Sequence, residues 1–366
     1  MAQRIELQAE WIESDGLGGF AMGTAGGFRT RRYHGLLAPA LSPPTGRHVL
    51  LDGFDAALTT SSGTHPLSTQ CYADGLLAPA GWESLERFDA EPWPTWTFVL
   101  ADGTRVVQEL FAVDGAPIVV VGWRLDGPRR ARRAGPRRRN GPQAGTATEP
   151  CLLRVRPLLS GRDHHELHQP NDALSFATEE RAAPAGESRL RWQPYSALPA
   201  VTSLANGRWR SEPHWYHRFH LAEEAARGFP AELALAAPGE LEFDLARGPA
   251  WWVIGQELAV LRKARGGQVT ARAISPIESR WHAAAFAEEA RAEEKARRRR
   301  LADASTRAAT QFLARRGAGR TLLAGFPWFT DWGRDTAIAA RGLLIATGRL
   351  GEARDVLRTW AAAQVG

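Results

Sequence analysis

The sequence is poor in cysteine and has no long apolar run, and each absence excludes a class of protein. Its 366 residues include two cysteines, Cys71 and Cys151, which lie far apart and in no metal-binding spacing. This usage fits a reducing compartment and argues against a disulfide framework or a zinc site. No apolar core of a signal peptide follows Met1, and no run of about 18 apolar residues could cross a membrane. We therefore expect a soluble, cytoplasmic protein with no membrane partner.

The sequence also lacks the glycine pattern of a nucleotide site. Residues 16–27 are rich in glycine, but neither the Lys-Ser/Thr ending nor the helix pattern of a phosphate-binding loop follows them. No strand leads into a GxGxxG turn and a helix elsewhere in the chain. We therefore expect no cofactor.

Positive charge is concentrated in one short stretch. The formal net charge is +6, yet residues 129–139 alone hold seven arginines and no acid, and without them the net charge is −1. A general basic face for nucleic acid is therefore not expected. Residues 127–149 are rich in Gly, Pro and Arg, and we predict a disordered insertion at a loop tip. A local patch for a polyanion is the alternative.

The pattern of apolar residues changes from strand-like to helical along the chain. Up to about residue 275, short apolar runs are separated by turn residues, which predicts a mainly β domain, a β-sandwich, over residues 1–275. Residues 277–315 contain no Gly or Pro and predict two helices that meet near Asp303, with residues 297–300 on a solvated face. Further helices are predicted over residues 336–346 and 352–363. We therefore expect a helical linker over 276–316 and a second, helical domain over 317–366.

A group of histidines near residue 165 raises the question of a metal site. His164, His165, Glu166 and His168 lie close in sequence, but their spacing is not the HExxH of a metal-binding helix. Adjacent histidines point apart on any regular element. We therefore expect no metal here.

Two N-terminal segments combine glycine with polar residues. Residues 10–20, EWIESDGLGGF, contain Asp15, and residues 30–37, TRRYHGLL, contain Arg31, Arg32, Tyr33 and His34. One interpretation is a loop that reaches a substrate cleft. The other is a buried polar network that holds loops between sheets, because Arg, Tyr and His each satisfy several backbone groups.

Residues 324–336, AGFPWFTDWGRDT, gather aromatic and charged residues just before a predicted helix. They include Trp328, Asp331, Trp332, Arg334 and Asp335. An indole can stack on the C–H face of a pyranose, while a carboxylate or guanidinium binds two adjacent hydroxyls. This composition favours a sugar-binding site. In the alternative interpretation, Asp335 caps the helix, Asp331 pairs with Arg334, and the tryptophans belong to the core.

Five segments together resemble the bacterial and archaeal glycogen debranching enzymes of the amylo-α-1,6-glucosidase type, and they occur in the family's order. The segments are Trp11 with residues 14–20 and 23–24, residues 30–37, residues 157–165, Trp215 with Tyr216, and residues 325–336. The sequence departs from the family at the Arg-rich residues 127–149. It also has Ser14 and Asp15 where the family usually has Thr or Ser followed by Asn.

The resemblance implies hydrolysis of α-1,6-linked glucose at the branch points of an α-glucan such as glycogen or a limit dextrin. It also implies an N-terminal β-sandwich, a helical linker and the first helices of an (α/α)6 barrel, which we expect to be incomplete in this chain. The general acid and base are then expected downstream of Gly366, so the chain alone is expected to have little activity.

Within residues 324–336, the resemblance implies glucose binding by Trp332, Arg334 and Asp335, with Trp328 and Asp331 beside them. Asp331 and Asp335 could also be proposed as a catalytic pair. Four residues apart at the start of a helix, however, they would lie on nearly the same side of the sugar. A non-catalytic α-glucan-binding module and a related (α/α)6 glycosidase or phosphorylase stay open as alternative functions.

Overall fold

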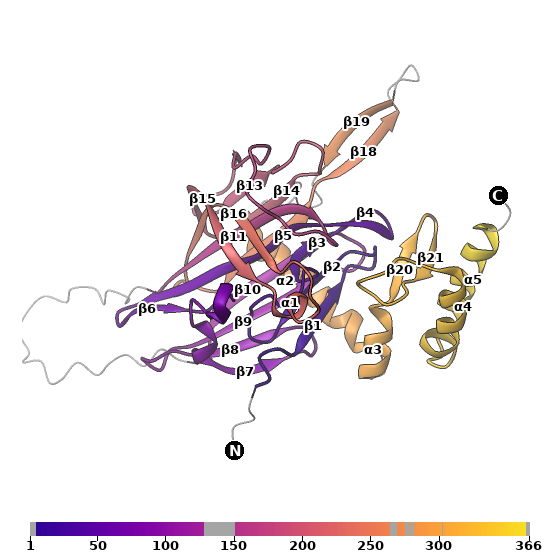
Figure 1. Ribbon diagram of the computed structural model, residues 1–366, viewed down its shortest axis with the longest axis horizontal. Coiled ribbons are helices and arrows are strands. Elements are labelled where there is room, and N and C mark those ends of the chain that lie inside the picture. Colours follow the sequence, from indigo (N-terminus) through magenta and orange to yellow (C-terminus); the bar gives the residue numbers. More distant parts are fainter. Residues whose placement is uncertain are drawn as a thin grey trace, which may run out of the picture.

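Two large antiparallel β-sheets dominate the computed structural model, which describes residues 5–127, 151–263, 269–274, 277, 282–301 and 303–363 (Figure 1). The helices are few and short, and most of them lie in the C-terminal quarter of the chain. Among the described residues, none of the helices combines the length and the apolar character that a bilayer crossing needs. The predicted insertion at residues 127–149 lies outside the described residues, apart from Gly127.

The first sheet has nine strands, in the order β1-β2-β3-β5-β11-β16-β15, with β4 and β6 paired to β5. Its central strands are long: β5 has 16 residues, β11 has 12 and β16 has 13. The strands are β1 (Glu10–Ser14), β2 (Phe20–Thr24), β3 (Gly35–Ala38), β4 (Ala40–Ser42), β5 (Thr45–Thr60), β6 (Gly63–Pro66), β11 (Leu152–Asp163), β15 (Arg208–His220) and β16 (Glu232–Asp244).

The second sheet has eight strands, in the order β12-β13-β14-β17-β10-β9-β8-β7. The strands are β7 (Leu85–Asp89), β8 (Thr95–Val99), β9 (Arg105–Ala112), β10 (Ile118–Leu125), β12 (Thr178–Arg181), β13 (Ser188–Trp192), β14 (Val201–Ala205) and β17 (Ala250–Gln256). A hairpin of β18 (Leu258–Lys263) and β19 (Val269–Ile274) follows and extends away from both sheets in Figure 1. The short helices η1 (Ala73–Gly75), η2 (Gly81–Ser84) and α1 (Ala222–Ala225) lie in connections between strands.

One hydrophobic core joins the inner faces of the two sheets. Leu51 and Leu153 of the first sheet are fully buried with Trp123 and Trp252 of the second. Each large apolar side chain buried in this way stabilises the fold by about 2–3 kcal/mol. The indole N–H of Trp123 donates to Gln108 Oε1 at 2.8 Å, so burial leaves this polar group satisfied.

Helix α2 (Ala283–Arg299) covers part of the outer face of the second sheet. Its Ala283 and Ala287 pack on Val120 of β10 and Val253 of β17. Because both faces of these two strands are covered, β17 is apolar at nearly every position instead of alternating.

The remaining elements form a small α/β unit beside the first sheet. They are α3 (Ala304–Thr310), the hairpin β20 (Leu313–Arg316) with β21 (Gly319–Leu322), α4 (Gly333–Ala340), the π-helical turn η3 (Arg341–Ile345) and α5 (Leu350–Ala363). Leu322, Leu344 and Val356 share its buried core. Figure 1 shows the hairpin between the sandwich and the α4–α5 pair.

Most predicted elements are confirmed. Among the short apolar runs predicted as strands before residue 275, four form β8, β9, β10 and β17. Asp303 caps α3, with its Oδ1 accepting from the backbone N–H of Thr306 at 2.7 Å. The predicted C-terminal helices correspond to α4 with η3 and to α5.

Two predictions in the helical region are wrong. Residues 313–315 are not helical, because they form β20 and turn back at Gly317, whose φ of 57° suits the first central position of a hairpin turn. The predicted solvated face at residues 297–300 contains a buried side chain, Arg298. Carboxylates of the sandwich and of α2 draw this guanidinium inward, as described below.

Candidate functional site

The loop of residues 323–332, between β21 and α4, is fixed to the sandwich by the buried side chain of Phe326. Phe326 is buried among Phe20, Val49 and Leu323, and its ring packs edge-on against that of Phe20 at 5.8 Å between centroids. The backbone N–H of Ala324 donates to the carbonyl of Thr330 at 3.0 Å and closes the loop. The start of α4 is therefore held in a defined position relative to the first sheet.

Arg47, at the start of β5, is the main polar anchor of this loop. Its guanidinium donates to the carbonyls of Phe329 at 3.0 Å and Pro327 at 3.4 Å, and also to the carbonyl of Gly18 at 2.5 Å. Burial lowers the pKa of Arg47 to about 10, and the nearby charges of Asp15 and Asp331 oppose that shift. Arg47 stays charged at neutral pH and joins three loops of the molecule.

Tyr33 brings the segment of residues 30–37 into contact with the same loop. Its ring lies perpendicular to that of Trp328, with 6.3 Å between centroids. Its hydroxyl is 3.2 Å from Nδ1 of His165, in the turn after β11. Both aromatic rings of the Tyr33–Trp328 pair are half-buried, so the contact leaves an accessible edge.

Trp332 and Arg334 lie exposed at the N-terminus of α4. Trp332 is 59% exposed and Phe329, three residues earlier, is 60% exposed. Arg334 is exposed and has no ion pair within the described part of the chain. Asp335 is half-buried and lines a surface hollow of about 290 Å³ together with Leu323 and Ile338. These side chains are available to a ligand rather than sealed in a core.

Asp331 is already occupied by a neighbouring arginine. Its Oδ2 lies 3.2 Å from Nε of Arg316 on β20, and its side chain is almost fully buried. The guanidinium of Arg316 in turn lies over the ring of Trp360 at 4.4 Å from its centroid. The alternative pairing of Asp331 with Arg334 is therefore wrong, because the hairpin supplies a closer cation.

The alternative prediction that Asp335 caps the helix is also wrong. The N-cap position of α4 is Trp332, which has extended backbone angles and makes no side-chain cap. Asp335 lies in the first helical turn, where a negative charge interacts favourably with the helix dipole without bonding to a free N–H.

Three of the four polar residues in the segment 31–34 belong to a polar network. Arg31 pairs with Glu10 at 2.5 Å and Arg32 with Glu224 at 3.2 Å. His34 is fully buried; its Nδ1 accepts from the N–H of Thr30 at 3.1 Å, so its Nε2 donates to Glu10 at 3.0 Å. Burial lowers the pKa of His34 and favours this neutral form. Within this segment, Tyr33 is the residue that touches the loop of residues 323–332.

Asp15 organises a turn in the first glycine-rich segment. Its Oδ1 accepts from the N–H of Leu17 at 2.8 Å and of Gly19 at 2.9 Å. Burial raises the pKa of Asp15 to about 6, although these two bonds and the charge of Arg47 oppose the shift. Asp15 therefore shapes the loop whose Gly18 carbonyl binds Arg47.

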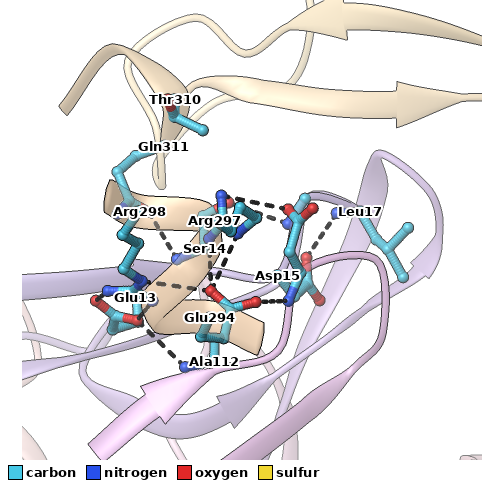
Figure 2. Close-up of polar contacts among 12 residues, drawn as sticks. Glu13, Ser14, Asp15, Leu17, Ala112, Glu294, Arg297, Arg298, Thr310 and Gln311 are labelled. Carbon is cyan, nitrogen blue, oxygen red and sulfur yellow. Dashed lines mark hydrogen bonds and ion pairs between the residues drawn. The ribbon is translucent and has the colours of Figure 1, made fainter. Parts of the chain in front are cut away.

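A buried ionic network fixes α2 to the sandwich (Figure 2). Arg298 donates to both carboxylate oxygens of Glu13 on β1, at 2.9 and 2.5 Å, and its Nε lies 3.3 Å from Glu294. Glu294 also accepts from Arg297 at 2.8 Å. These carboxylates explain why Arg298 is buried. Ser14 N–H donates to Gln311 at 2.7 Å, which ties the same strand to the end of α3.

The histidines after β11 are arranged differently from the prediction. His164 and His165 lie in a turn, so their rings do not point apart and approach to 3.9 Å between centroids. Burial, with His165 and Arg47 nearby, lowers the pKa of His164 to about 4. Within the described residues no three His, Cys, Asp or Glu side chains converge as metal ligands.

Arg47 is the residue at this site that the sequence patterns did not indicate. The available signal was an arginine directly before an apolar run, which resembles the ordinary flank of a strand. Its partners are backbone carbonyls up to 282 residues away in sequence. No local pattern reports such partners.

Two family models match this chain. A family model described as "Glycogen debranching enzyme N terminal" matches residues 9–251, which is most of the sandwich. The chain belongs to the glycogen debranching enzyme family. A second model, described as "Amylo-alpha-1,6-glucosidase", matches residues 307–365. Residues 324–336 of this family member therefore lie within the second match, and Tyr33 and Arg47 within the first.

Among solved structures, this debranching-family chain is similar to a bacterial glucoamylase complexed with acarbose, at 8% identity and a TM-score of 0.38. The similarity covers 84% of this chain and 40% of that chain, so the chain spans less than half of the glucoamylase. No curated protein sequence matches it significantly.

Proposed function

We propose that this debranching-family chain acts in the hydrolysis of α-1,6-glucosidic branch linkages of an α-glucan. Its own contribution is to hold a glucose unit at the start of α4 with Trp332, Arg334 and Asp335. The observation that carries the proposal is the exposure of Trp332 and Arg334 on a backbone that Arg47 and Phe326 anchor to the sandwich.

The arrangement suits a neutral, hydroxyl-rich ligand. An exposed indole offers a flat apolar face to the C–H groups of a pyranose. An unpaired guanidinium offers a planar fork of donors to two vicinal hydroxyls. Since the loop backbone is already fixed, binding costs little additional ordering of the protein.

The carboxylates of residues 324–336 support a binding role more than a catalytic one. Hydrolysis of a glycoside requires one carboxylic acid and one free carboxylate on opposite sides of the bond. Asp331 is neutralised by Arg316 and almost fully buried, so it is poorly placed for either task. We therefore expect this chain alone to release glucose slowly.

We further propose that α4, η3 and α5 are the first helices of an (α/α)6 barrel. The family match over residues 307–365 supports this proposal, as does the shared core of Leu344 and Val356. In this arrangement the sandwich covers residues 1–275, residues 276–316 connect the two parts, and the barrel begins at about residue 317.

Binding of a branched limit dextrin, measured by calorimetry, tests the proposal. We expect Trp332→Ala to weaken binding by about tenfold or more, since stacking of this kind contributes about 1.4 kcal/mol. Leu76→Ala is the control, because Leu76 is a large apolar residue of similar exposure, 61%, that does not line the hollow beside Asp335. Equal affinity of the Trp332→Ala variant and the unaltered chain would overturn the assignment.

A non-catalytic α-glucan-binding module is a second candidate, favoured by the ion pair that occupies Asp331. Glucose release from a phosphorylase-limit dextrin separates the two functions. A slow but measurable rate that Asp335→Ala abolishes supports the hydrolase. Tight glucan binding with no glucose release supports the module.

A further inference from the structure

A second, larger cleft lies between the β20–β21 hairpin, α5 and the sandwich loops at Gly16 and Asp114. Its volume is about 1080 Å³. Six arginines and three carboxylates line it, and two of the arginines also pair with carboxylates outside the lining, Glu294 and Asp331, which leaves an excess of one positive charge. The arginines are Arg297, Arg315, Arg316, Arg320, Arg349 and Arg358, and the carboxylates are Asp114, Glu352 and Asp355.

Two of the arginines face each other directly across the hairpin. Arg315 on β20 and Arg320 on β21 are register partners, and both are exposed. Opposite residues of an antiparallel pair project from the same face, with about 5 Å between their Cβ atoms, and like charges in such positions repel. The hairpin therefore presents two guanidinium groups together, at a cost that a bound anion would remove.

The carboxylates of the cleft compensate this charge only in part. Glu352 serves two cations: Arg349, at 2.5 Å, and Arg320, at 3.5 Å. Asp355 lies 3.6 Å from Arg354. Arg315 and Arg358 have no ion pair within the described residues. Positive charge in the cleft is thus concentrated on groups free to bind a ligand.

The other two arginines of the lining are held by acids at its edges. Arg297 pairs with Glu294 at 2.8 Å, and Arg316 with Asp331 at 3.2 Å. Nη1 of Arg316 and Oδ2 of its ion-pair partner Asp331 are both buried without a hydrogen-bond partner. A buried donor of this kind costs free energy unless an acceptor reaches it.

We propose that this cleft binds a phosphate monoester. Such a group carries about −1.5 to −2 charges near pH 7 and three strong acceptor oxygens. It matches the two arginines of the lining that have no ion pair within the described residues, Arg315 and Arg358, and their planar donor forks. A carboxylate would supply one charge and leave the repulsion across the hairpin largely in place.

The ester belongs either to a free sugar phosphate or to a phosphorylated α-glucan, which share this chemistry. The site uses residues other than Trp332, Arg334 and Asp335. The proposal therefore goes beyond the proposed glucan function and can be tested in the absence of glucan.

Calorimetric titration of the whole chain with glucose 1-phosphate at low salt tests the site, with neutral glucose as the reference ligand. The double variant Arg315→Ser/Arg358→Ser should weaken binding by about tenfold or more, because the two lost charge-assisted contacts together contribute over 1.4 kcal/mol. Arg87→Ser/Arg247→Ser is the charge-matched control, since both side chains are largely exposed and lie outside the cleft. It should bind within about twofold of the unaltered chain, because screened surface charges contribute little at a distance.

A third variant should strengthen binding instead of weakening it. Glu352→Gln removes the carboxylate shared by Arg320 and Arg349 and should tighten binding of glucose 1-phosphate by about threefold or more. Unfolding temperatures of all variants check that the fold is retained. The site is refuted if glucose 1-phosphate does not bind, or if the two double variants lose affinity equally.

A final pair of titrations separates the two sources of the ester. In the Trp332→Ala variant, which lacks the proposed glucan contact, a phosphorylated dextrin that binds more tightly than glucose 1-phosphate, and loses most of its affinity on dephosphorylation, identifies the polymer. Equal binding of both esters identifies a free sugar phosphate. Dextrin binding that survives dephosphorylation, with no binding of glucose 1-phosphate, overturns the proposal.

Discussion

The guanidinium of Arg47 donates to the backbone carbonyl of Phe329 at 3.0 Å, across 282 residues of sequence. The contact joins the start of β5 to the loop that precedes α4. With the edge-on packing of Tyr33 on Trp328, it sets where the exposed Trp332 and Arg334 stand relative to the sandwich. The candidate site is thus built by two parts of the chain that match two different family models.

Replacement of Arg47 should unfold the junction. We expect Arg47→Ala to lower the free energy of unfolding by about 3 kcal/mol, because several buried carbonyls and the charge of Asp15 lose their partner. Chemical denaturation measures the change, with the exposed Arg87→Ala as the control. A loss below about 0.5 kcal/mol, the usual size for a surface change, would contradict the anchoring role.

Trp332 and Asp335 should affect turnover without affecting stability. The assay uses a protein that contains this chain and hydrolyses limit dextrin. In it, we expect Trp332→Ala or Asp335→Ala to lower kcat/KM by about 100-fold or more, equivalent to over 2.7 kcal/mol of transition-state binding. The unfolding temperature should stay within about 2 °C because Trp332 is 59% exposed. Unchanged kinetics would show that Trp332 and Asp335 do not act in substrate binding.

Asp15 should make stability depend on pH in the acidic range. Its pKa is raised from 3.8 to about 6 in the folded state, so the native protein binds more protons than the unfolded chain between these values. The resulting contribution to stability is complete below pH 4 and is lost as the pH rises to about 6.

Asp15→Asn should remove this dependence, because an amide oxygen can still accept from Leu17 and Gly19. At pH 7 we expect a gain of about 1 kcal/mol, less than the full shift implies, since Arg47 loses an opposing charge. Denaturation curves at pH 4 and pH 7 measure both effects. An identical pH slope in the two proteins would show that Asp15 has a normal pKa.

Two adjacent arginines of α2, Arg298 in the ionic network of Figure 2 and Arg299 outside it, should contribute very differently to stability. Arg298→Ala should cost about 3–5 kcal/mol, because it leaves the buried carboxylate of Glu13 without a cation. The adjacent Arg299 is exposed, so Arg299→Ala should cost less than about 0.5 kcal/mol. Similar losses in the two variants would mean that the whole arginine run, rather than one position, holds the helix.

The helices of the C-terminal unit should make the chain associate. Ile338 is 67% exposed and Leu350 is 63% exposed, and Ile345 and Leu357 also face solvent. Apolar side chains gathered on one unit favour association. We expect light scattering to show oligomers or aggregates that Ile338→Ser/Leu350→Ser reduces. A clean monomer at high concentration would contradict this expectation.

The sequence by itself determined the elements whose causes are local. The change from short apolar runs to a Gly- and Pro-free segment predicted helices after about residue 277, and α2 begins at Ala283. An Asp before a helical run identified the cap of α3, and the apolar spacing over residues 352–363 identified the helix α5. Periodicity, capping and turn chemistry each depend on a few neighbouring residues, so they can be read directly from the chain.

The tertiary structure alone decided which partner each charged side chain took. Asp331 pairs with Arg316 of the hairpin, although Arg334 is nearer in sequence. Arg298 lies in a run of charged residues on α2 but pairs with Glu13, 285 residues away. Arg47 likewise serves loops that only folding brings together. An ion pair depends on the distance and burial of both groups, and the fold of the entire chain fixes these quantities.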